Sequence, residues 1–169
     1  MSRILKAAAI QMRSGIDPAR NMEALAPLVA DAAAAGASFV STPEMTTCLE
    51  RNAQRRADAS AKNEADPAIQ AAAEMARAHK IWLHLGSAAF ASEGLKIFNR
   101  ALVFSPEGKI TARYDKIHLF DVDLGKEKYR ESDYIEWGTE AVIADLGGPK
   151  LGLSICYDVR FAPLYRRLA

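Results

Sequence analysis

Residues 17–44 read DPARNMEALAPLVADAAAAGASFVSTPE, and this stretch predicts a helix followed by a strand. Asp17 is a capping carboxylate, and Pro18 takes the first helical position, where its missing N–H costs nothing. Apolar residues then recur at helical spacing until a glycine ends the helix. Residues 38–42 predict a strand that runs into Pro43 and Glu44. Units of this kind in a chain of mixed strands predict an α/β or α+β sandwich.

The flanking segments extend this pattern. Residues 4–10 predict a buried first strand, although their alanines would also suit a helix. Residues 117–138 have no clear periodicity, and a segment of that length in a compact domain is usually functional or disordered. The other expected elements are a polar loop through residue 56 with a weakly defined stretch to 65, a helix from Asp66-Pro67 to about 80, strands at 81–86, 98–104 and 109–114, a hairpin of 141–145 with 150–156, and a helix from Phe161.

Composition narrows the class of protein. Half of the 169 residues are hydrophobic, which predicts one sizeable core and one domain over residues 1–169. The 22 basic and 21 acidic residues nearly balance, so we expect neither nucleic acid nor a membrane as partner. The two cysteines lack metal-type spacing and fit a reducing cytosol. Without a signal peptide or an apolar run of membrane-spanning length, the sequence predicts a cytoplasmic protein.

No cofactor is expected. The chain has no Gly-x-Gly-x-x-Gly or similar phosphate-binding loop. His84 alternates within an apolar strand and predicts a core or interface residue, and His79 closes a helix, where a cation suits the dipole. His118 follows Lys116 by two residues, a spacing that is no metal-ligand signature.

Cys156 is the main candidate for chemistry. It ends the apolar run Lys150-Leu-Gly-Leu-Ser-Ile-Cys156, and strand ends that break into a turn are where α/β enzymes commonly place nucleophiles. A buried structural cysteine is an equal alternative for this segment alone. Glu44 and Lys116, each at a strand-to-loop junction, favour the interpretation of Cys156 as a nucleophile. A reactive thiol needs a base to remove its proton and a cation to stabilise negative charge.

The partners of Cys156 have ordinary alternatives of their own. Taken alone, Glu44 is more often an exposed loop carboxylate, and Lys116 a solvated lysine. If Glu44 is instead partly shielded from water, it suits a general base. Glu131, in the long aperiodic segment, has the weakest individual case.

Three motifs resemble the nitrilase superfamily, the carbon–nitrogen hydrolases, in residues and in order. They are Thr42-Pro-Glu-Met45, Arg113-Tyr-Asp-Lys-Ile-His118 and Leu151-Gly-Leu-Ser-Ile-Cys-Tyr-Asp-Val-Arg-Phe161. Residues 118–123 and Glu131-Ser132 look most like the branch of omega-amidases and deaminated-glutathione amidases. The resemblance implies an αββα sandwich and hydrolysis of small carboxylate-bearing amides without a metal or organic cofactor.

The resemblance also implies a role for each residue. Cys156 would attack the amide carbonyl, and Glu44 would take the thiol proton and pass it to the leaving ammonia. Lys116 would stabilise the oxyanion together with the backbone N–H of Tyr157, and Glu131 would orient the lysine. Water would then hydrolyse the thioester.

Two departures from the family pattern follow Phe161. The chain has Ala162-Pro163 where the family often has a proline–acidic pair, and it ends thirteen residues after Cys156, whereas family members continue. We therefore expect only the N-terminal portion of the sandwich, incomplete at its C-terminus. Nitrilase or N-acyltransferase chemistry, and an inactive truncated remnant acting only through association, remain alternatives.

Substrate contacts and assembly are less constrained. Arg130 and Arg160 are candidates for binding a substrate carboxylate, with Lys126 and Lys128 nearby, because arginine pairs with carboxylates in a bidentate manner. That these residues are solvated loop charges or members of structural ion pairs is an equal alternative. The family resemblance also makes a homodimer possible.

Overall fold

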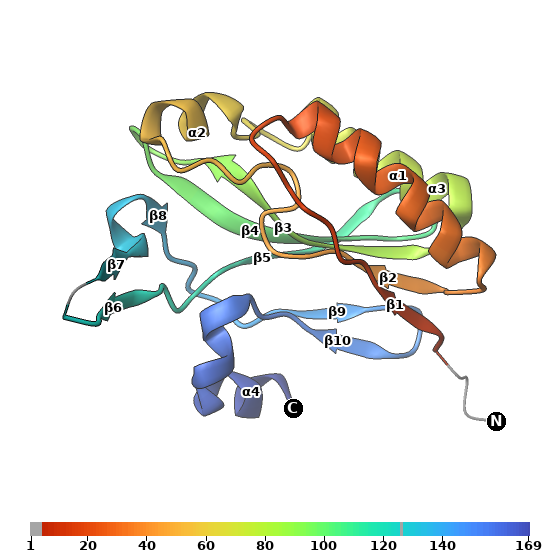
Figure 1. Ribbon diagram of the computed structural model, residues 1–169. Coiled ribbons are helices and arrows are strands. Elements are labelled where there is room, and N and C mark those ends of the chain that lie inside the picture. Colours follow the sequence, from red (N-terminus) through yellow and green to blue (C-terminus); the bar gives the residue numbers. More distant parts are fainter. Residues whose placement is uncertain (1–4, 126) are drawn as a thin grey trace.

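The computed structural model describes residues 5–125 and 127–169. Figure 1 shows α1 and α3 lying over one face of the main sheet, and the β9–β10 hairpin with α4 on the opposite side. The helices are α1 (Pro18–Ala34), α2 (Ala53–Ala59), α3 (Pro67–His79) and α4 (Ala162–Leu168), with 3₁₀ turns η1 (Glu131–Asp133) and η2 (Cys156–Arg160). The strands are β1 (Ala7–Ala9), β2 (Phe39–Ser41), β3 (Trp82–Ala91), β4 (Ile97–Phe104), β5 (Ile110–Asp115), β6 (Asp121–Asp123), β7 (Lys128–Arg130), β8 (Ile135–Glu136), β9 (Ile143–Asp145) and β10 (Lys150–Gly152). This mixed α/β architecture confirms the predicted fold class.

The main sheet has six strands in the order β1-β2-β3-β4-β5, with β8 paired to β4. The pairs β1–β2 and β2–β3 are parallel, and helical crossovers join these strands, as parallel pairing requires. The pairs β3–β4 and β4–β5 are antiparallel and follow one another along the chain. In this strand order, β3 and β4 lie between β2 and β5. Strand β2 leads into Glu44 and strand β5 into Lys116, both of which are predicted catalytic residues.

The helical face holds the larger core. Asp17 caps α1 by accepting from the backbone N–H groups of Ala19 and Arg20, as the sequence predicted. Leu25 of α1 and Ile69 of α3 are fully buried between the helices and the sheet. Burying side chains of this size stabilises the fold by about 2 kcal/mol each.

The opposite face is covered only in part. Phe39, Val103 and Tyr114 on the sheet pack against a cluster that includes Leu146 of the β9–β10 hairpin and Ile155 beyond it. Strand β1 lies at the sheet edge, and its first and last alanines, Ala7 and Ala9, are exposed. The prediction of a buried strand over residues 4–10 was therefore wrong in its burial, and residue 4 lies outside the described residues.

Three predicted boundaries also change. The polar stretch before residue 65 contains α2, whose first turn is capped by the side chain of Asn52. The aperiodic segment 117–138 contains the β6–β7 hairpin, η1 and β8. The last strand ends at Gly152 rather than at Cys156, because the Ile155 N–H donates to the Asp158 carboxylate at 2.9 Å.

None of the helices in the described part of the chain combines the length and the apolar character needed to cross a membrane.

Candidate active site

Lys116 is the centre of the site. Its side chain is fully buried, and its Nζ donates to both oxygens of Glu131 at 2.8 and 3.1 Å and to Glu44 Oε1 at 3.2 Å. The alternative of a solvated lysine is thereby excluded. A buried ammonium needs opposite charges and hydrogen bonds to offset its desolvation, and two carboxylates supply them here.

Glu44 and Lys116 meet across the sheet through Asn99. Glu44 follows β2 and Lys116 follows β5, so β3 and β4 separate them. Asn99 on β4 donates from Nδ2 to Glu44 Oε1 at 2.7 Å, and its backbone carbonyl accepts from the Lys116 N–H at 3.0 Å. The sequence prediction missed Asn99, although a fully buried amide within an apolar strand was a possible signal.

Glu131 is held from both sides. Its Oε2 accepts from the backbone N–H of Phe120 at 2.7 Å as well as from Lys116. The residue begins η1, directly after β7, so the β6–β7 hairpin carries it towards the lysine. The aperiodic segment therefore contributes a predicted site residue.

Two glycines allow the backbone of this region to pack closely. A Cβ atom at Gly86 would lie 2.0 Å from the carbonyl oxygen of Thr42, two residues before Glu44. A Cβ atom at Gly138 would lie 2.1 Å from the carbonyl oxygen of Asp115, the residue before Lys116, and the Gly138 N–H donates to the Lys116 carbonyl at 2.8 Å. Only glycine fits these two contacts.

Cys156 begins η2 in an unusual backbone conformation. Its φ is +48°, in the left-handed region that non-glycine residues seldom adopt, and the residue is exposed rather than buried. The alternative of a buried structural cysteine is therefore wrong. Strained residues of this kind cluster at active sites, where the surrounding structure holds them in place.

The Cys156 thiol is not activated at rest. Partial shielding of the sulfur from water raises its pKa above the ordinary value, and the charge of Glu44 adds to the rise. The charge of Lys116 lowers the pKa of the thiol, but this effect is smaller than the sum of the others. The lysine is already paired with two carboxylates. The lysine therefore favours the thiolate, as expected, but the pKa of the thiol stays raised overall, so the thiol needs a base.

Lys116 stays protonated in spite of its burial. Desolvation alone would lower the pKa of its ammonium, but the hydrogen bond that it donates to Glu131 and the charges of Glu44 and Glu131 raise the pKa above the ordinary value. The group is therefore a fixed cation and a hydrogen-bond donor at neutral pH.

Asp158 forms a second buried centre in the same turn, two residues after Cys156. Its fully buried carboxylate accepts from Tyr114 Oη at 2.6 Å, the Ile155 N–H at 2.9 Å, and the His118 N–H and ring Nδ1 at 2.9 and 2.7 Å. The His118 ring stacks on Phe161 with centroids 3.6 Å apart. These contacts fix both ends of the turn that carries Cys156. Neither Asp158 nor Tyr114 was predicted as a site residue.

The remaining predicted residues lie around this turn. Tyr157 follows Cys156 in η2 and packs its ring edge-on against Phe120 and Phe161. Arg130 and Arg160 are both exposed. Lys126 lies outside the described residues. The roles of Tyr157, Arg130 and Arg160 stay predictions.

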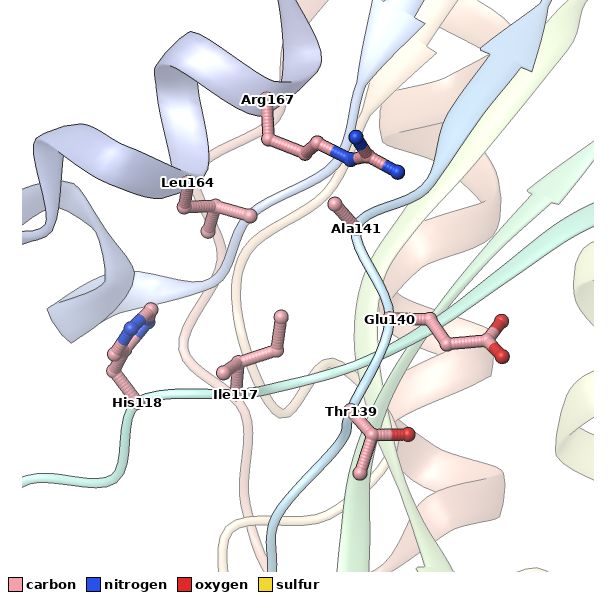
Figure 2. A pocket seen from close by; sticks show the side chains of 7 residues that line it. All are labelled: Ile117, His118, Thr139, Glu140, Ala141, Leu164 and Arg167. Atoms are coloured by element: carbon pink, nitrogen blue, oxygen red, sulfur yellow. The ribbon is translucent and has the colours of Figure 1, made fainter.

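Two hollows lie near the site. A cavity of about 720 Å³ is lined by Glu44 and Glu131 together with Met45, Arg56 and Tyr134. Figure 2 shows a separate hollow of about 530 Å³, which is bordered by His118, Glu140 and Arg167 and contains none of the four predicted catalytic side chains. Within residues 5–125 and 127–169, no cluster of three His, Cys, Asp or Glu side chains is arranged to hold a metal ion.

A mixed sheet covered by helices, with an exposed cysteine beside a buried lysine and two glutamates, is the architecture of the nitrilase superfamily. Residues 6–169 match the family described as Carbon-nitrogen hydrolase, and the chain belongs to that family. The predicted family membership is thereby confirmed.

Several relatives of this chain are named as amidases. The deaminated glutathione amidase of Yersinia enterocolitica is 37% identical over 137 residues, which cover 79% of this chain and 48% of that protein. The omega-amidase of Mus musculus is 34% identical over 93% of this chain and 56% of its own length. The chain thus spans about half the length of the curated relatives that it matches.

Solved structures agree with this fold. The NitFhit protein of C. elegans is 32% identical, with a TM-score of 0.84 over 94% of this chain and 39% of that one. An amidase from Nesterenkonia sp. is 25% identical, with a TM-score of 0.80 over 96% of this chain and 61% of that one.

Proposed function

We propose that this chain carries the catalytic centre of an amidase that hydrolyses the C–N bond of a small carboxylate-bearing amide through a Cys156 thioester. The main support is the convergence of Lys116, Glu44 and Glu131 beside an exposed cysteine in a strained turn. The family and the amidase names of several relatives support the same reaction class.

Acylation begins with proton transfer from the Cys156 thiol to Glu44. The raised pKa of the thiol makes a base necessary, and Glu44 is the carboxylate whose charge acts most strongly on this thiol. The sulfur then forms a bond to the amide carbon, and the carbonyl oxygen becomes an oxyanion. Lys116 and the backbone N–H of Tyr157 donate to this oxygen, and fixed donors of this kind contribute about 3 kcal/mol each.

The tetrahedral intermediate collapses when the C–N bond breaks. Glu44 returns its proton to the leaving nitrogen, so ammonia departs and a thioester remains on Cys156. A water molecule then gives a proton to Glu44 and attacks the thioester carbon. The second collapse releases the carboxylic acid, and the sulfur recovers its proton from Glu44. Glu131 holds the Lys116 ammonium in position throughout.

Ammonia release from succinamate tests the proposal, with Cys156→Ser as the variant and Cys48→Ala as the matched control for the other thiol. We expect Cys156→Ser to lose more than about 10³-fold in kcat, because a hydroxyl with this base is a much weaker nucleophile. We expect Cys48→Ala to stay within about threefold of the parent, because a lone buried cysteine acts as a small apolar residue. Retained turnover in Cys156→Ser would reject the cysteine mechanism.

The thioester itself can be trapped. Hydroxylamine competes with water for an acyl-enzyme, so the parent protein should form a hydroxamate while it releases the same amount of ammonia. Ammonia release without hydroxamate would contradict the covalent intermediate. If butyronitrile were hydrolysed as fast as succinamate, the result would instead favour the nitrilase alternative.

A further inference from the structure

Arg56 is a buried arginine at the edge of the proposed active site. It lies in α2, and the residue is only 6% exposed. Its guanidinium group stacks over the ring of Tyr134 at 4.3 Å, and its Nη1 donates to the carbonyl oxygens of Glu50 and Arg51 at 3.4 and 3.2 Å. One end of the side chain is thereby fixed in place.

The other edge of this guanidinium has no acceptor. Arg56 Nε is buried without a hydrogen-bond partner, and no ion pair of Arg56 occurs within residues 5–125 and 127–169. Arg55, Arg100 and Arg113 each use the same edge, Nε with Nη2, to bind a carboxylate side chain. Arg56 therefore presents an unoccupied edge of the type that carboxylates occupy elsewhere in this chain.

The same cavity brings this arginine to the catalytic carboxylates. Arg56 and Tyr134 line it together with Glu44 and Glu131. Tyr134 contacts both groups, because its ring stacks on the Arg56 guanidinium at 4.3 Å and its backbone N–H donates to the Glu131 carbonyl oxygen at 3.0 Å. A small molecule in this cavity can therefore face both groups.

Charge balance also favours an anion near Arg56. Glu44 and Glu131 share the single cation of Lys116, which leaves one negative charge in excess at the catalytic end. A substrate that carries its own carboxylate is repelled there unless a second cation binds that carboxylate. Arg51 and Arg56 both line the cavity, and neither is paired with a carboxylate side chain in the part of the chain that the structure describes. Of the two, Arg51 is exposed and only Arg56 is buried in a fixed position.

We propose that Arg56 is the specificity residue of this site and binds the remote carboxylate of an ω-monoamide through the Nε–Nη2 edge. The inference rests on the proposed amidase function and assigns the carboxylate contact to α2, in place of the exposed Arg130 and Arg160.

Succinamate and butanamide form a matched pair of test substrates, because they differ only by the remote carboxylate. In Arg56→Met, we expect kcat/KM for succinamate to fall by about 10²-fold while that for butanamide changes less than about threefold. Arg56→Lys keeps the positive charge but cannot make the two parallel hydrogen bonds of a guanidinium. The fall in kcat/KM for succinamate should therefore be intermediate and result from a higher KM. Arg55→Met removes the neighbouring cation of the same helix and should leave the substrate ratio unchanged.

Equal losses for both substrates in Arg56→Met, or a loss confined to Arg160→Met, would overturn the assignment. If Arg56→Met fails to fold, an unchanged KM for succinamate in Arg56→Lys would overturn it as well.

A binding measurement separates this inference from the amidase function. Succinate should slow the alkylation of Cys156 by iodoacetamide in the parent protein and lose this effect in Arg56→Met. A parent protein that hydrolyses neither amide contradicts the amidase function, and succinate protection still decides whether Arg56 binds a carboxylate. Equal protection in both proteins would reject the arginine site.

Discussion

Two buried ionisable centres flank Cys156, and they differ in how their charge is satisfied. Lys116 is a single cation between two carboxylates, and one of these, Glu44, has a side chain that is 33% exposed. Asp158 is a single carboxylate that accepts four hydrogen bonds and has no exposed surface. The first centre holds an excess charge beside a cavity, whereas the second is closed and saturated.

This difference suggests that the Lys116 centre takes part in proton transfer and that the Asp158 centre holds the backbone in place. An unbalanced group of charges can change partners when a proton moves, which is what acid–base catalysis requires. A saturated carboxylate cannot do so without losing hydrogen bonds, so it suits the fixing of a turn. The comparison predicts that damage to the first centre removes activity, and that damage to the second mainly removes stability.

Lys116→Met should give the largest effect. We expect kcat to fall by about 10³- to 10⁴-fold, because the oxyanion loses its cation and two carboxylates then face each other. Ammonia release measures the activity, and circular dichroism checks the fold. Lys150→Met, which breaks the exposed pair with Asp145, should leave both unchanged. Substantial activity in Lys116→Met would break the comparison.

Asp158→Asn should mainly affect stability. The amide offers one acceptor oxygen to donors that now share two, so we expect the free energy of unfolding to fall by about 3 kcal/mol. Urea titration measures this loss. Tyr114→Phe removes one of the four bonds and should cost about 1 kcal/mol. A stable Asp158→Asn protein with no activity would assign Asp158 to the chemistry instead.

His84 sharpens the comparison as a buried group without a counter-charge. Burial lowers its pKa to about 4, its Nδ1 lies 2.9 Å from Ser41 Oγ, and its Nε2 has no partner among the described residues. The unfolded chain takes up this proton near pH 6.5 and the folded chain only near pH 4. The contribution of His84 is therefore complete above pH 6.5 and is lost as the pH falls towards 4.

Urea titrations at pH 7.5 and pH 5 measure this loss. The parent protein should lose about 2 kcal/mol more than His84→Asn between these two values. His79→Asn, at the exposed end of α3, should behave like the parent. An equal pH dependence in His84→Asn and the parent would contradict the neutral buried histidine.

Glu44→Gln should give a small but diagnostic shift in the reactivity of the Cys156 thiol. The charge of Glu44 raises the pKa of this thiol, so its removal should shift the pH profile of iodoacetamide alkylation to lower pH. Hydrolysis should nevertheless be lost, because the base is gone. A profile shifted to higher pH would mean that Glu44 activates the thiol at rest.

Local signals predicted the helices best. Asp17-Pro18 and Asp66-Pro67 each supply a cap and a first-turn proline within two residues, and α1 and α3 begin there. Helix α2 was missed because its residues are mostly charged or small, so no apolar stripe follows the Asn52 cap. The β6–β7 hairpin was missed because most of its residues are exposed, which removes the alternation that marks a half-buried strand.

In the site, too, residues within sequence motifs were predicted and residues defined by long-range contacts were not. Glu44, Lys116, Glu131 and Cys156 were named from motifs, and hydrogen bonds join the first three in the structure. Asn99 and Asp158 were not, because their importance depends on contacts with Glu44 and Tyr114, which lie 55 and 44 residues away in the chain. Arg56 was overlooked because a missing acceptor leaves no trace in the sequence.

The close contacts of Gly86 and Gly138 have a genetic consequence. Neither residue has a functional group, yet an alanine at either one would collide with the main chain just before Glu44 or Lys116. Any larger side chain must displace Glu44 or Lys116 from its partners. Under the proposed function, inactivating missense changes should therefore concentrate at these two positions as strongly as at Cys156.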